Sequence, residues 1–208
     1  MRLLIALGLA YLAGSFPTAY LLGRARGVDV GAAGSGNYGT TNVFRTLGPA
    51  SAIVALVVDV AKGLLAVELL PRWIPVPELT PLTYGVLIGI AAILGHVFSV
   101  WLGFRGGKGI ATAFGVFMAL APWVTFAAMI VWVAVVLIGR VVSLASLAAA
   151  VALLLGVIAV HGGTLERDWP IIAATVVLVA LVFWTHRSNI ERLRRGQEKP
   201  IAAMRRVR

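Results

Sequence analysis

Long uninterrupted apolar runs constrain the fold of this 208-residue chain more than any other feature. They cover residues 3–22, 50–70, 82–102, 110–138, 141–160 and 169–185. A helix needs about 20 apolar residues to cross the hydrocarbon of a bilayer. Hydrophobic residues make up 60% of the chain and charged residues 12%, whereas soluble domains have about 45–50% and about 25%. The sequence therefore predicts an all-α integral membrane protein.

The loop charges predict the number and orientation of the spans. The run over residues 110–138 is too long for one span, and Pro122 lies near its middle, where proline breaks or kinks a helix. Splitting it gives seven transmembrane helices, some of them short, and places fourteen Lys and Arg on the side of the C-terminus and three on the other. Six spans would separate the basic C-terminus from the first basic loops. The positive-inside rule thus favours seven spans, with the N-terminus outside and the C-terminus in the cytoplasm.

Composition excludes several other classes. The chain has no cysteine, so disulfides and thiolate metal sites are excluded, and we expect no metal. The net charge of +10 resembles that of a nucleic-acid-binding protein, but eight of the eighteen Lys and Arg lie in the last 22 residues. In a membrane protein, such clusters report orientation and contact with anionic headgroups. We expect one polytopic domain over residues 1–199, a basic disordered cytoplasmic tail at 200–208, and no nucleic-acid partner.

The stretch "GAAGSGNYGTTNVFR", residues 31–45, is polar and rich in glycine. It matches G-x-G-x-x-G, but a dinucleotide-binding turn needs a preceding strand, and here a transmembrane helix precedes the loop. Glycine backbones, hydroxyls and a guanidinium are the groups that bind a phosphate. A flexible linker is the alternative interpretation. The predicted phosphate-binding residues are Ser35, Gly36, Asn37, Gly39, Thr40, Thr41 and Asn42, with Arg45 closing the site.

A second polar stretch, "GHVFSVWLGFRGGKGIATAFG", covers residues 95–115. It is one residue short of a P-loop and has Gly109 where the hydroxyl should be, so it implies no magnesium site. Lys108 lies between Gly107 and Gly109, just before an apolar helix, which predicts a second anion site. A basic loop that only sets topology is the alternative. His96 either contributes to this site or makes a hydrogen bond across the helix bundle.

The third polar stretch, residues 186–199, follows the last span. His186 and Asn189 are three residues apart and share a helical face, whereas His186 and Glu191, five apart, do not. We therefore expect His186 to act with Asn189. Ser143, at the start of an earlier helix, either caps that helix or reaches the same polar site.

Asp59 and Lys62 are three residues apart inside a span. At this spacing they lie on one helical face and can neutralise each other. Ionisable residues at membrane depth are candidates for function, but a pair that orders the helix bundle is the more economical interpretation.

Five segments together resemble the bacterial acyl-phosphate:glycerol-3-phosphate acyltransferase family (PlsY). They are "GSFPTAYLLGR", "GSGNYGTTNVFR", "GHVFSVWLGFRGGKGIATA", "RVVSLASL" and "HRSNIERLRRGQE". The resemblance extends to about Lys199 and implies a multi-pass enzyme of the bacterial inner membrane whose active site faces the cytoplasm. It implies transfer of a fatty acyl group from acyl phosphate to the 1-hydroxyl of glycerol 3-phosphate, giving lysophosphatidic acid and inorganic phosphate in phospholipid biosynthesis. No cofactor is expected.

The residues suit this reaction, because an acyl phosphate carries a good leaving group and needs no covalent enzyme nucleophile. We expect Arg45 and Lys108 to neutralise phosphate charge and His186 or Asn189 to position the attacking hydroxyl. The proton could go to His186 or to a substrate phosphate oxygen, and the sequence leaves both open. An organic-phosphate transporter and a non-catalytic anion-binding membrane protein are the competing functions.

Overall fold

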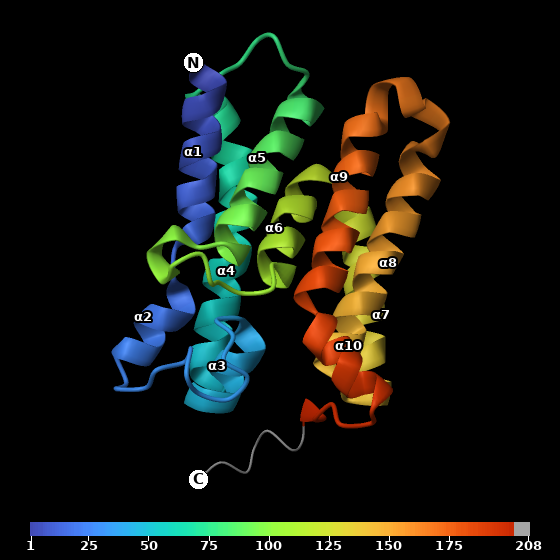
Figure 1. The fold of residues 1–208 in the computed structure, drawn as a ribbon. Coiled ribbons are helices and arrows are strands. Elements are labelled where there is room, and N and C mark those ends of the chain that lie inside the picture. Colours follow the sequence, from blue (N-terminus) through green and yellow to red (C-terminus); the bar gives the residue numbers. More distant parts are fainter. Residues whose placement is uncertain (202–208) are drawn as a thin grey trace. The chain divides into compact units, whose positions relative to one another are not determined.

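The computed structural model describes residues 1–201, and every regular element in that range is a helix, as predicted. The chain forms two compact units, Met1–Leu120 and a second that begins at Ala121 (Figure 1). A single domain over residues 1–199 stays a prediction. Most of the predicted tail, residues 202–208, lies outside the described residues, whereas the backbone N–H of Ile201 donates to the carbonyl of Arg140 at 2.7 Å.

In the first unit, proline divides the first apolar run into two helices. Pro17 restricts Phe16 to an extended conformation, with φ −49° and ψ 119°, so the chain breaks there. A short turn, η1 (Val100–Leu102), follows the fifth helix. The helices of this unit are α1 (Arg2–Ser15), α2 (Thr18–Arg24), α3 (Thr40–Leu47), α4 (Pro49–Trp73), α5 (Pro81–Val97) and α6 (Ile110–Leu120).

Glycines let the helices of the first unit pack backbone to backbone. A Cβ atom on Gly14 of α1 would lie 2.0 Å from the carbonyl oxygen of Ala92 in α5, so only glycine fits there. Gly63 of α4 faces the carbonyl of Thr112 in α6 in the same way, at 2.3 Å. Small residues commonly permit such close crossings in membranes. Figure 1 shows α1 and α5 side by side, and the Ser15 hydroxyl donates to the Gly95 carbonyl at 3.1 Å.

The second unit contains α7 (Pro122–Gly139), α8 (Val142–His161), the short turn η2 (Gly162–Thr164), α9 (Leu165–Thr185) and α10 (Arg187–Arg194). The predicted break at Pro122 is confirmed, since α6 ends at Leu120 and α7 begins at Pro122. At the turn between α8 and α9, His161 Nδ1 lies 2.8 Å from Asp168 Oδ2, and the Thr164 hydroxyl donates to the same oxygen.

Four helical stretches within residues 1–201 are long and apolar enough to cross a membrane. They are Arg2–Arg24, Pro81–Leu102, Pro122–Gly139 and Val142–Thr185, the last of which contains both α8 and α9. The other two predicted spans are also helical: α4 carries buried charges, and α6 has 11 residues. The count of seven spans and their orientation stay predictions.

Candidate active site

The loop before α3 is held together by the side chain of Asn42, which is only 2% exposed. Its amide nitrogen donates to the carbonyls of Val30 and Ala33, both at 3.0 Å, and its oxygen accepts the N–H of Ser35 at 2.8 Å. Gly34 has φ +63°, and a Cβ there would lie 2.2 Å from the Asn42 oxygen. Asn42, predicted to bind phosphate, thus uses both amide hydrogens within the loop and fixes its shape.

Several backbone groups predicted to contact phosphate also bond within this loop. The N–H of Gly36 donates to the Ala33 carbonyl at 3.0 Å, and that of Gly39 donates to Asn37 Oδ1 at 2.8 Å. Together with the N–H of Ser35, these donors shape the loop itself. The G-x-G-x-x-G match follows α2 and precedes α3, so the strand that a dinucleotide-binding turn requires is absent from these described residues.

The start of α3 carries several of the predicted polar site residues. Among the described residues, the buried Thr40 hydroxyl oxygen has no hydrogen-bond partner. Thr41 and Arg45 follow on α3 and are four residues apart, so they share one face of the helix. The N-terminus of a helix favours anions, because its N–H groups and its dipole point outward.

The glycine–lysine loop, residues 103–109, lies against the end of α5. The N–H groups of Gly106 and Gly107 donate to the carbonyls of Val97 and His96, at 3.0 and 3.1 Å. Gly107 was predicted to bind substrate, but its N–H forms a hydrogen bond within the protein, to the His96 carbonyl. Gly109 has φ +86°, a conformation that favours glycine and turns the chain into α6. Lys108 lies between Gly107 and Gly109 and is half-buried.

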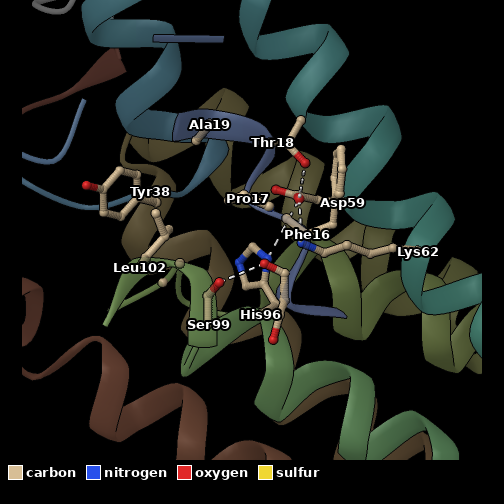
Figure 2. A pocket seen from close by; sticks show the side chains of 13 residues that line it. Phe16, Pro17, Thr18, Ala19, Tyr38, Asp59, Lys62, His96, Ser99 and Leu102 are labelled. Atoms are coloured by element: carbon tan, nitrogen blue, oxygen red, sulfur yellow. Dashed lines mark hydrogen bonds and ion pairs between the residues drawn. The ribbon is translucent and has the colours of Figure 1, made fainter. Parts of the chain in front are cut away.

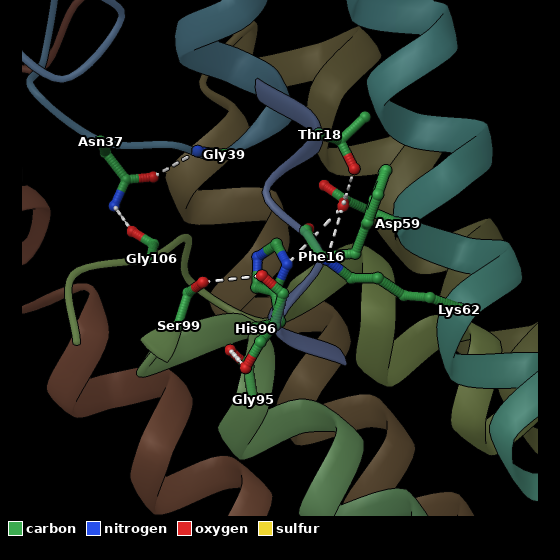
Figure 3. Close-up of polar contacts among 11 residues, drawn as sticks. Phe16, Thr18, Asn37, Gly39, Asp59, Lys62, Gly95, His96, Ser99 and Gly106 are labelled. Atoms are coloured by element: carbon green, nitrogen blue, oxygen red, sulfur yellow. Dashed lines mark hydrogen bonds and ion pairs between the residues drawn. The ribbon is translucent and has the colours of Figure 1, made fainter. Parts of the chain in front are cut away.

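Asn37 joins the two predicted phosphate loops. Its side-chain nitrogen donates to the Gly106 carbonyl at 3.4 Å, while its oxygen accepts the N–H of Gly39 (Figure 3). The structure therefore brings together the first and second polar stretches, which the sequence places about 70 residues apart. Gly106 lies in the glycine–lysine motif that the sequence indicates, and the tertiary contact adds that its carbonyl accepts from Asn37.

His96 is buried beneath the glycine–lysine loop and is 7% exposed. Its Nδ1 atom lies 3.7 Å from Asp59 Oδ1. The expected pairing of Asp59 with Lys62 is confirmed, with 2.8 Å between Lys62 Nζ and Asp59 Oδ1. These three side chains line a small pocket with Thr18, Tyr38 and Ser99 (Figure 2).

In the second unit, His186 and Asn189 are both buried, at 3% and 4% exposed. His186 Nδ1 lies 2.8 Å from the Val182 carbonyl oxygen. A carbonyl only accepts, so Nδ1 is the donor in this contact. Glu191 accepts instead from Arg195 on the exposed surface. The expected action of His186 with Asn189 stays a prediction.

Glu198 accepts hydrogen bonds from three polar residues of the second unit, and it was not among the site residues predicted from the sequence. Its carboxylate accepts from Ser143 Oγ at 2.9 Å, from Asn189 Nδ2 at 2.6 Å and from Arg192 Nε at 2.6 Å. Burial raises the pKa of Glu198, but these three donors outweigh it and hold the pKa below its ordinary value. The available signal was an acidic residue two positions after Gly196 in a basic segment.

The described residues include no group of three or more His, Cys, Asp or Glu side chains able to hold a metal ion. The predicted site residues carry hydroxyls, amides, an imidazole and cations. Such groups bind phosphate and orient a hydroxyl.

Comparison with known proteins agrees with this chemistry. The family model for glycerol-3-phosphate acyltransferase matches residues 4–196. The glycerol-3-phosphate acyltransferase of Geotalea daltonii is 45% identical over 91% of this chain and 92% of its own length. That of Myxococcus xanthus is 46% identical over 92% of this chain and 95% of its own.

Solved structures agree as well. A crystal structure of PlsY, an integral membrane glycerol 3-phosphate acyltransferase, in its glycerol 3-phosphate form superposes with a TM-score of 0.86. It is 33% identical and covers 96% of each chain. The lysophosphatidic acid form gives a TM-score of 0.84. The chain therefore belongs to the glycerol-3-phosphate acyltransferase family and is an integral membrane acyltransferase.

Proposed function

We propose that this enzyme takes its acyl group from an acyl phosphate and transfers it to the 1-hydroxyl of glycerol 3-phosphate. The products are lysophosphatidic acid and inorganic phosphate, and the reaction takes place at the cytoplasmic face of the bacterial inner membrane. The chief support is the hydrogen bond from Asn37 to the Gly106 carbonyl, which joins the two loops predicted to bind phosphate. The chain's membership of this family adds to it. The related PlsY structures are described as glycerol 3-phosphate and lysophosphatidic acid forms.

The reaction needs positioning and charge neutralisation rather than a covalent enzyme nucleophile. The hydroxyl oxygen attacks the acyl carbon, a new ester bond forms, the bond to the phosphate oxygen breaks, and inorganic phosphate leaves. Negative charge grows on the carbonyl oxygen and on the departing phosphate, where fixed cations lower the barrier most. Lys108 and Arg45 supply that positive charge, with Thr40 and Thr41 as hydroxyl donors.

His186 is suited to receive the hydroxyl proton. With Nδ1 donating to the Val182 carbonyl, the lone pair on Nε2 is the basic site of the neutral ring. Asn189 and Ser143 are held by Glu198, which fixes their orientation. A substrate phosphate oxygen is the competing proton acceptor.

The test supplies purified protein with glycerol 3-phosphate and either acyl phosphate or acyl-CoA, and follows free phosphate and lysophosphatidic acid. We expect turnover with acyl phosphate only, and a loss of about 100-fold or more in kcat for Lys108→Ala. Arg72→Ala is the matched control, because it removes only an exposed ion pair with Glu68. Activity with acyl-CoA alone would overturn the proposed donor.

Two further outcomes would identify the competing functions. Uptake of glycerol 3-phosphate into proteoliposomes, without release of phosphate from acyl phosphate, would indicate a transporter. Binding with neither turnover nor uptake would indicate a non-catalytic anion-binding protein.

A further inference from the structure

A buried cluster of ionisable side chains in the first unit has no part in the proposed reaction. Asp59 and Lys62 on α4 and His96 on α5 have side chains that are 3%, 7% and 7% exposed. A buried ion pair contributes little to stability, because removing two charges from water costs about as much as their attraction returns. Stability alone therefore does not account for a pair in this place.

The cluster connects α4 to the break between α1 and α2. Asp59 Oδ1 accepts from the Thr18 hydroxyl at 3.3 Å and lies 2.8 Å from Lys62 Nζ. Lys62 Nζ also donates to the Phe16 carbonyl at 3.3 Å (Figure 3). The Phe16 carbonyl belongs to the break and also accepts the N–H of Thr18 at 3.1 Å. The two charges thus hold the start of α2 against α4.

His96 extends the cluster to the glycine–lysine loop. Its carbonyl accepts the N–H of Gly107 at 3.1 Å. Its ring lies directly beneath that residue, because a Cβ on Gly107 would be 2.1 Å from His96 Nε2. Gly106 and Gly107 line the same pocket as Asp59, Lys62 and His96. The imidazole therefore supports the backbone that carries Lys108.

We propose that Asp59, Lys62 and His96 are positioning residues, which hold the Gly106–Lys108 segment in the conformation that receives a substrate phosphate. They act through the loop and touch no substrate. This inference rests on the proposed function, because the proposed reaction supplies the phosphate that the loop would bind. Through Asn37, which donates to the Gly106 carbonyl, the same cluster also steadies the loop before α3.

Two variants test the proposal. His96→Ala removes the ring beneath Gly107. The double variant Asp59→Asn with Lys62→Met removes both charges at similar volume, and so avoids leaving one charge buried alone. Gly107→Ala serves as the reference, because its added methyl group presses on the same ring. Ile88→Ala is the matched control: Ile88 is fully buried on α5, two turns before His96, and lies away from the loop.

We expect His96→Ala and the double variant to raise the KM of one phosphate substrate by at least about tenfold, with kcat within about threefold of the wild type. The affected substrate should be the one whose KM rises in Gly107→Ala. Ile88→Ala should lower the melting temperature and leave both KM values within about twofold. KM values within about twofold of the wild type in both test variants would overturn the proposal and leave the cluster a purely structural role.

Calorimetric binding of glycerol 3-phosphate and inorganic phosphate separates this inference from the proposed function. If the wild type binds one of them but does not turn over, the proposed function fails. An affinity at least about tenfold weaker in the two test variants then still supports the positioning role, and an unchanged affinity overturns it. A wild type that binds neither phosphate overturns both.

Discussion

Replacing Glu198 by alanine should destabilise the second unit. The Glu198 side chain is 5% exposed and accepts three hydrogen bonds. The bonds from the buried Ser143 and Asn189 go to a charged acceptor, which makes each worth about 1.5 kcal/mol or more. Arg192 is 39% exposed, so water can hydrate its guanidinium once Glu198 is removed. Its ion pair with Glu198 therefore contributes less than about 1 kcal/mol to the free energy of unfolding. The expected loss in the free energy of unfolding is about 3 kcal/mol.

The assay is thermal unfolding of the purified protein in detergent, followed by tryptophan fluorescence. For a chain of this length, a loss of about 3 kcal/mol corresponds to a melting temperature lower by roughly 6–12 °C. Glu191→Ala is the matched control, because Glu191 is 62% exposed and pairs only with the exposed Arg195. It should melt within about 2 °C of the wild type.

The pH dependence of this difference has a definite sign. The pKa of Glu198 in the folded protein lies below its ordinary value of 4.5. The ionised carboxylate therefore stabilises the folded state fully above that value, and its contribution is lost as the pH falls through the folded pKa. The difference in melting temperature between the wild type and Glu198→Ala should be largest at neutral pH and become smaller below pH 4.5. A Glu198→Ala protein that melts within about 1 °C of the wild type at neutral pH would refute the reasoning.

Three further predictions concern other parts of the chain. Gly14→Ala should lower the melting temperature by several degrees, since its methyl group overlaps the Ala92 carbonyl, whereas Gly8→Ala on the same helix meets no atom within 4 Å and should not. Asn42→Ala should speed proteolysis within residues 31–39, because it removes three hydrogen bonds that fold the loop; Asn37→Ala, which loses two, should do so less. His186→Gln should lower kcat by about 100-fold or more, and the exposed Glu191→Gln should leave it unchanged; full activity in His186→Gln would leave the substrate phosphate as the proton acceptor.

Much of the fold could be predicted from the sequence, because its signals are local. Apolar runs require helices in a bilayer, whose hydrocarbon offers no partners to backbone N–H and C=O groups. Pro122 lies at the predicted helix break because proline lacks the N–H that a continuing helix needs, whereas the break at Pro17 was not predicted. The pairing of Asp59 with Lys62 also follows from the helical period. In each case, residues within one helical turn decide the outcome.

The candidate sites could be predicted only as residue types. The sequence indicates phosphate binding by residues 31–45 and around Lys108, but it also suggests that the Asn42 amide binds the phosphate. In the structure, the Asn42 amide hydrogens go to the carbonyls of Val30 and Ala33. A side-chain amide binds a backbone carbonyl as readily as a phosphate, so residue type alone cannot distinguish the two roles.

The sequence by itself determined an all-helical membrane protein, the helix break at Pro122 and the residue types that suit phosphate. Only the tertiary structure decided that Asn37 meets Gly106, that His96 lies beneath Gly107 and that Glu198 holds Ser143. The Asn37 and Glu198 contacts join residues far apart in the chain, and the His96 contact depends on how the loop folds back onto α5. No periodicity encodes such contacts, because close helix packing and loop closure set them.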